Sequence, residues 1–149
     1  MANFEKLHTQ IHEITERNNV FRFLIQDRLM CDNRITRDIF SDYVRLVREH
    51  MEQVDRDFCR RLLLNEAQSV RNTADRFLSG SSEIKRIFSQ YLKKYCSERS
   101  KDLRIKDYDA FVADTNHMFD LVLDRIQRET EHLYPLVRRL ESQKTQQAA

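Results

Sequence analysis

Residues that interrupt helices are almost absent from this chain. The 149 residues include one glycine, Gly80, and one proline, Pro135, and no tryptophan. All-β and α/β domains need many turns built on glycine and proline, so this scarcity excludes both classes and predicts an all-α fold. No stretch approaches the roughly 20 consecutive apolar residues of a membrane-spanning helix, and we therefore expect no membrane partner.

Cysteine and net charge are also scarce. The three cysteines, Cys31, Cys59 and Cys96, are odd in number and widely spaced. This pattern favours reduced thiols in a cytoplasmic protein over a disulfide framework. The start of the chain lacks the apolar run of a signal peptide. The net charge of +2 is nearly balanced, so the composition indicates no nucleic-acid partner.

Apolar residues recur at intervals of three and four through most of the chain, which is the pattern of helices with one buried face. The pattern predicts four long helices, over about residues 3–30, 36–64, 66–96 and 107–140. Short connections between long helices indicate an up-down-up-down antiparallel four-helix bundle. We expect one domain over residues 1–140, followed by a flexible tail at 141–149.

Local signals refine these helix bounds. Thr36 is a candidate N-cap for the second helix, and a basic polar loop is expected at 97–106. The third helix should continue through Gly80, because the apolar stripe keeps its phase on both sides; the missing side chain would permit a close approach by a neighbouring group. Pro135 should kink the fourth helix, because it lacks an N–H and crowds the preceding turn.

A layer of polar residues interrupts the predicted core. In an antiparallel pair of helices, residues at equal distances from the connection lie at the same height in the bundle. By this criterion, five polar positions on or beside the apolar stripes lie at about the same height. They are Asn18, His50, Ser81, Arg125 and Glu129. A buried carboxylate at Glu129 requires a cation or a strong donor, and Arg125 and His50 are the charged candidates. Such a layer adds little net stability but can fix the register of the helices.

Three segments resemble hemerythrin-like (HHE cation-binding) domains, over about residues 4–140. The sequence EHLYPL at 131–136 resembles the end of the last helix of that family, and residues 46–58 around His50 resemble its second helix. Residues 72–88 resemble a bacterial branch of these domains. The resemblance implies a four-helix bundle and, in the family, a di-iron centre held by histidines and carboxylates from all four helices.

Several positions depart from that ligand set. His50 and Glu129 match it, but Val54 stands where a glutamate is expected and Arg125 where a histidine is expected. Asn18 is at the level of the first-helix ligand, and the third helix contains no histidine. A fixed cation repels iron and a valine cannot bind it, so we expect no cofactor and a hydrogen-bonded layer instead.

A displaced metal site is the alternative. His8 and His12 are one helical turn apart, a spacing that lets two imidazoles bind one metal. Carboxylates or a histidine from the other helices could complete a site for iron, zinc or manganese. The candidate ligands are then His8, His12, His50, Asp55, Asp75, Glu129 and His132.

The function predicted from these patterns is that of a non-enzymatic regulatory or protein-interaction module whose di-iron site is degenerate. Its protein partner is not identified by the sequence. The alternative is a metal- or O2-binding protein with a rearranged site. No serine or cysteine has a base at a recognisable motif spacing, so nucleophilic catalysis is not indicated. A homodimer is an expectation too, through Phe23, Leu29 and Met118 outside the main stripes.

Overall fold

The computed structural model describes residues 4–31, 33–96 and 103–148. Its helical elements, in chain order, are α1 (Phe4–Leu24), α2 (Arg28–Cys31), α3 (Arg34–Val54), η1 (Asp55–Cys59), α4 (Arg60–Leu62), α5 (Gln68–Tyr95), α6 (Tyr108–Arg128), η2 (Glu129–Leu133) and α7 (Tyr134–Ala148). Within the described ranges there is no strand, and the β-bridge between Cys96 and Leu103 is isolated. The all-α prediction is confirmed.

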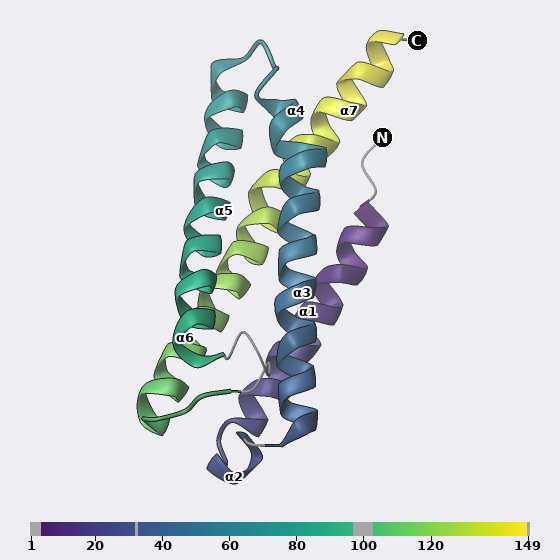
Figure 1. Cartoon of the computed structure of the whole chain (residues 1–149). Helices are drawn as coiled ribbons and strands as arrows, with labels where there is room; N and C mark the ends of the chain where they lie inside the picture. Colours follow the sequence, from purple (N-terminus) through teal and green to yellow (C-terminus); the bar gives the residue numbers. More distant parts are fainter. Residues whose placement is uncertain (1–3, 32, 97–102, 149) are drawn as a thin grey trace.

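The elements form a helical bundle of long rods (Figure 1). Two of the rods are composite, because α3, η1 and α4 follow one another without a break, as do α6, η2 and α7. Helix α1 contacts α3 and α6, and α5 contacts α6 and η1. None of the helices in the described part of the chain is long and apolar enough to cross a membrane.

The third predicted helix is a single element. Helix α5 runs from Gln68 to Tyr95 without interruption at Gly80, as the unbroken apolar stripe predicts. It begins after Asn65, whose side-chain oxygen accepts a hydrogen bond from the backbone N–H of Ala67 at 2.9 Å. The loop expected at 97–106 is described only from 103 onward, where it is not helical; residues 97–102 lie outside the described ranges.

The first two predicted helices have different ends in the structure. Helix α1 ends at Leu24, not near residue 30, and the short α2 follows. The Asp27 carboxylate accepts from the backbone N–H of Leu29 at 2.9 Å, and such local bonds compete with helix continuation. The N-cap of α3 is Asn33, which accepts from the N–H of Ile35, and not Thr36, which is buried.

Two π-helical segments, η1 and η2, lie within the composite rods. The N–H of Arg60 donates to the carbonyl of Asp55, and the N–H of Tyr134 donates to that of Glu129. Each bond spans five residues, so each segment inserts one extra residue into the helix. Pro135, where a kink is expected, lies two residues after the end of η2, and the kink itself stays a prediction. Asp55 and Glu129 begin the two π segments, and both are buried.

The C-terminal segment is helical. Helix α7 continues to Ala148, so the boundary predicted after residue 140 does not coincide with a helix end. Residues 142–147 are exposed, which explains why an apolar stripe is absent from them. The flexibility expected of residues 141–149 stays a prediction, and residue 149 lies outside the described ranges.

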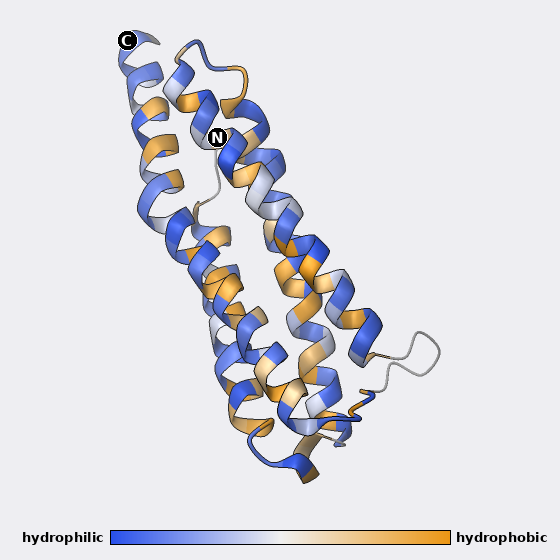
Figure 2. Ribbon diagram, turned by 90° about the vertical axis from the view of Figure 1, so that its left-hand side faces the viewer, coloured by the Kyte–Doolittle hydropathy of each residue, from blue (hydrophilic) through white to orange (hydrophobic). Residues whose placement is uncertain are grey.

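The apolar core is divided into two clusters. The larger one includes Phe21, Tyr43 and Phe119 and occupies the end of the bundle near α2; the smaller one includes Phe58 and Tyr134 at the other end. Hydrophilic residues cover much of the outside of the rods (Figure 2). Met118, predicted as an exposed dimer contact, is buried in the larger cluster with 1% of its surface exposed. Its helix turns that side chain inward beside Phe119.

Candidate functional site

His50 and Glu129 are paired in the interior. The Nε2 atom of His50 lies 2.7 Å from Oε1 and 3.2 Å from Oε2 of Glu129, and 1% of His50 and 0% of Glu129 is exposed. The other ring nitrogen, Nδ1, is 2.9 Å from Oε1 of Gln10. Gln10 in turn donates to Oε1 of Gln53 at 2.9 Å. Both ring nitrogens therefore lie within hydrogen-bond distance of side-chain oxygens.

Arg125 carries the fixed positive charge of this interior site. Its Nη1 donates to the carbonyl of Phe77 at 2.6 Å and its Nη2 donates to Oγ of Ser81 at 2.8 Å. The guanidinium also lies 4.8 Å from the centre of the Phe77 ring. Two carboxylates are close to it, Asp55 at 3.7 Å and Glu129 at 3.9 Å. The cation of α6 is thus bound to α5 and lies between the acids of η1 and η2.

Asp55 completes the interior arrangement. Its Oδ1 accepts from the hydroxyl of Ser81 at 2.8 Å, and its Oδ2 is 3.5 Å from Nζ of Lys85. A buried carboxylate is stable only when it is paired and hydrogen-bonded, and both conditions are met here. We call the connected set the polar network; its members are Gln10, His50, Gln53, Asp55, Ser81, Lys85, Arg125 and Glu129.

Four of the five residues of the predicted layer belong to the polar network, and Asn18 does not. Asn18 is buried, but its Oδ1 accepts from the hydroxyl of Tyr43 at 3.4 Å. Gln10 is the α1 residue that reaches His50. It lies eight positions earlier, which is about 12 Å along a helix. The sequence therefore predicted the wrong residue of α1 opposite His50, with an error of about two helical turns. The reason is that α1 ends at Leu24 and not near residue 30.

Sequence reasoning did not place Gln10, Gln53 and Lys85 in this site. Gln53 follows His50 by three residues, so both lie on one side of α3. Gln10 follows the buried Leu7 by the same interval on α1. A polar residue three positions after a buried residue was therefore the sequence signal that could have placed Gln10 and Gln53 in the site. Lys85 is exposed at its own position and reaches Asp55 through its long side chain.

The residues of the displaced metal site are not brought together. His8, His12, Asp75 and His132 are exposed. His8 Nε2 is 3.3 Å from Nη2 of Arg138, and His12 is 3.7 Å from Glu16 on its own helix. Asp55, Glu129 and His50 are engaged in the polar network. In the described ranges, no group of three or more histidine, cysteine, aspartate or glutamate side chains could hold a metal ion.

The di-iron centre of hemerythrin-like domains does not fit the polar network either. Val54 is fully buried and packs in the smaller apolar cluster, so it supplies no ligand atom. Arg125 places a fixed cation 3.9 Å from Glu129, the carboxylate that would have to bind iron. His50 is already bound to that carboxylate.

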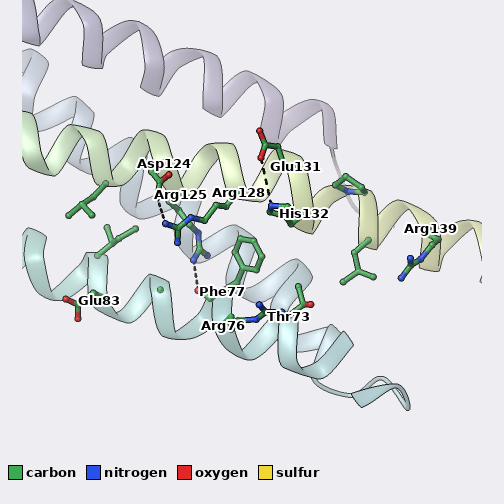
Figure 3. Close-up of a pocket in the computed structure, with 15 residues that line it drawn as sticks. Thr73, Arg76, Phe77, Glu83, Asp124, Arg125, Arg128, Glu131, His132 and Arg139 are labelled. Carbon is green, nitrogen blue, oxygen red and sulfur yellow. Dashed lines mark hydrogen bonds and ion pairs between the residues drawn. The ribbon is translucent and has the colours of Figure 1, made fainter. Parts of the chain in front are cut away.

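A groove of about 750 Å³ lies beside the polar network, between α5 and the rod of α6, η2 and α7 (Figure 3). Its apolar lining consists of Phe77, Ile84, Leu121, Pro135 and Leu136. Four arginines also line it: Arg76, Arg125, Arg128 and Arg139. The sequence indicated only that Gly80, which belongs to this groove, would permit a close approach.

Burial shifts the pKa of two groups next to the polar network. Burial, assisted by the charge of Asp55, raises the pKa of the Cys59 thiol to about 12. The pKa of the Tyr134 hydroxyl is raised by burial and by the charge of Glu129. Both groups therefore stay protonated at neutral pH, and neither supplies an anion to this site.

Comparisons with family models, curated proteins and solved structures found no significant match to this chain. The resemblance to hemerythrin-like domains therefore depends on the quoted residues alone. A function for this chain has to be argued from the geometry of the polar network and of the surface.

Proposed function

We propose that the chain is a cytoplasmic, non-enzymatic regulatory module that acts by binding another protein, and that its polar network replaces the metal centre of a hemerythrin-like bundle. One observation carries this proposal. The guanidinium of Arg125, held by Phe77 and Ser81, lies between Asp55 and Glu129 in the interior. The negative charges that would attract a metal cation are thereby neutralised by a side chain of the protein itself.

The energetics favour this assignment. A metal at Glu129 would have to displace His50 and would meet the charge of Arg125 a few ångströms away. Breaking a buried ion pair costs about 3–5 kcal/mol, because one charge is left without its partner. The hydrogen-bonded pairs also connect α1, α3, η1, α5, α6 and η2, so the network is suited to holding the rods in register.

An up-down-up-down antiparallel order of the four rods is part of the proposal. It is supported by the neighbours of each rod, since α1 contacts α3 and α6 while α5 contacts α6 and η1. Rods that are consecutive in sequence are thus adjacent in space, and the first is adjacent to the last. This is the arrangement of an antiparallel bundle with short connections. The reduced thiols of Cys31, Cys59 and Cys96 support the cytoplasmic assignment.

The corner formed by α1, α2 and α3 is the proposed contact for a protein partner. Exposed apolar side chains are gathered between residues 20 and 35 of this corner: Val20, Phe23, Leu29 and Ile35. Phe23 is 73% exposed and Leu29 is 84% exposed. Exposed apolar side chains of this size are found at protein contacts, and a second copy of the chain is the simplest partner.

Metal analysis tests the first part of the proposal. Protein produced in medium supplied with iron and zinc should contain only substoichiometric metal, and anaerobic Fe(II) loading followed by air should produce no new near-ultraviolet absorption. The double variant V54E/R125H restores two family ligands and should gain weak iron binding. The matched variant V54Q/R125Q removes the cation without adding these ligands and should not. A pair of irons bound per wild-type chain would disprove the proposal.

Sedimentation velocity tests whether the corner formed by α1, α2 and α3 mediates dimerisation. Wild-type protein should dimerise at high micromolar concentration, and F23S/L29S should remain monomeric. The control variant L64S removes an equally exposed leucine of the α4–α5 connection and should dimerise as the wild type does. A monomeric wild type would exclude the second copy and leave a different protein as the partner.

A further inference from the structure

The groove between α5 and the rod of α6, η2 and α7 is built differently from the rest of the surface. Its lining follows intervals of three and four residues on both sides, from Thr73 to Ile84 on α5 and from Leu121 to Arg139 on the opposite rod. One face of each helical rod therefore lines the same space, and the two rods are in contact at Arg125, which bonds to Phe77 and Ser81. The volume of about 750 Å³ lies in the range of roughly 300–1,000 Å³ found for small-molecule sites.

Positive charge is left over on the rim of this groove. Its three acidic residues already have polar partners: Glu83 is bonded to Arg86, Asp124 to Arg128, and Glu131 to Gln127. Arg76 on α5 and Arg139 on α7 line the groove from its two sides (Figure 3). Neither of these arginines makes an ion pair or hydrogen bond to another residue of the described ranges.

The floor of the groove combines a fixed cation with apolar walls. Arg125 is 6% exposed, and its guanidinium lines the groove against Gly80, which has no side chain. Phe77, Leu121 and Leu136 provide apolar surface on both sides of it. Binding sites for amphipathic molecules combine such walls with a small number of charged groups that orient the ligand.

We propose that this groove binds a small amphipathic anion, with an apolar chain along Phe77, Leu121 and Leu136 and a carboxylate or phosphate between Arg76 and Arg139. Arginine suits this role, because its planar fork donates to two oxygens of one anion. A carboxylate and a phosphate present the same chemistry to these two side chains, so the experiment separates them. The proposal does not depend on whether the polar network replaces a metal centre, or on the corner at α2.

Calorimetric titrations test the proposal with three probes below their critical micelle concentrations: laurate, dodecyl phosphate and the uncharged dodecyl maltoside. At least one of the two anions should bind more tightly than the maltoside, and the tighter one identifies the head group. The variant R76Q/R139Q should bind that anion about tenfold more weakly, since two charge-assisted contacts are lost. Acetate or inorganic phosphate without a chain should bind weakly or not at all.

A control variant separates a local effect from the effect of net charge. Arg34 and Arg61 are exposed and lie outside the groove, and R34Q/R61Q changes the net charge by the same amount. It should bind the anion as the wild type does. Amide chemical shifts should change at residues 73–84 and 121–139 and not at residues 20–35.

Each of the following results would overturn the proposal. They are equal binding of dodecyl maltoside, an equal loss in R34Q/R61Q, shift changes confined to the α2 corner, or no binding of either anion. An acidic amphipathic peptide that occupied the groove when neither anion did would assign it to protein docking and would also overturn the proposal. Because these variants leave His50, Glu129 and Phe23 unchanged, the metal and sedimentation tests remain independent of this one.

Discussion

Nη1 of Arg125 lies 2.9 Å from the position that a Cβ atom would occupy at Gly80. Real Cβ atoms essentially never come so close to another heavy atom. The glycine therefore leaves room for a guanidinium that bonds to Phe77 and Ser81 on the same helix. The glycine in the middle of α5 and the cation of the polar network are parts of one arrangement.

Replacing Gly80 with alanine should destabilise the protein, although alanine is the better helix former by about 1 kcal/mol. The added methyl would lie too close to Nη1 of Arg125, so the guanidinium must shift although it is bonded to Phe77 and Ser81, and overpacking of this kind costs about 1–3 kcal/mol. Urea unfolding measures the change. The exposed neighbour S79A is the control and should be neutral or slightly stabilising. Equal or higher stability of G80A would contradict the contact.

A double-mutant cycle isolates this contact from other effects. In the background R125M the penalty of G80A should fall, because the flexible apolar side chain has no bonds to lose. The coupling free energy should be about 0.5–3 kcal/mol, as for residues in direct contact. Additive effects of the two substitutions would show that Gly80 and Arg125 act separately.

Glu129 should tolerate an amide better than truncation. The variant E129A leaves Nε2 of His50 without its carboxylate partner and removes the carboxylate that lies 3.9 Å from Arg125, and it should cost about 3–5 kcal/mol. The variant E129Q keeps the size and an acceptor oxygen and should cost less. Chemical denaturation ranks the two, with the exposed E131A as a control within about 0.5 kcal/mol of the wild type. The pairing would be wrong if E129Q were as unstable as E129A.

The decrease in the stability of the fold at acidic pH should depend on Asp114. A hydrogen bond from Tyr95, followed by one from Lys94, lowers the pKa of Asp114 below its ordinary value of 3.8. A lowered pKa in the folded state stabilises the fold above the ordinary value, and this contribution is lost as the pH falls through the folded pKa. The wild type should therefore exceed D114N in stability at neutral pH.

Thermal melts between neutral pH and about pH 2 test this prediction. The advantage of the wild type over D114N should shrink below the ordinary pKa and vanish at the lowest pH. Asp75 is exposed, and D75N serves as the control with little change at any pH. An advantage over D114N that did not vary with pH would rule out the ionised carboxylate as its source.

Cys59 should be protected from thiol reagents in the folded protein. It is fully buried, and its pKa is raised to about 12, so the reactive thiolate is rare at pH 8. Cys96 is only half-buried, and it should react first with iodoacetamide. Peptide mapping by mass spectrometry reads the order of labelling, and urea should equalise the rates. Native labelling of Cys59 as fast as Cys96 would mean that the smaller apolar cluster opens readily.

The sequence alone determined the helical class and the burial of the main polar residues. The scarcity of glycine and proline and the apolar spacing predict helices, because local periodicity decides which face of a helix is buried. The same spacing predicts that Ser81 and Glu129 lie inward and that α5 continues through Gly80, and the structure agrees. The resemblance to hemerythrin-like domains adds expectations about metal that stay untested.

Only the tertiary structure decided which of these residues meet. The end of α1 at Leu24, and not near residue 30, moved the level of this helix and brought Gln10, not Asn18, to His50. The π segments each add one residue to a turn, which no average helical period anticipates. Arg125 and Gly80 are 45 positions apart in the sequence and share a space only because α5 and α6 pack together. Contacts between helices depend on the level and rotation of both partners, and a residue pattern within one helix does not contain that information.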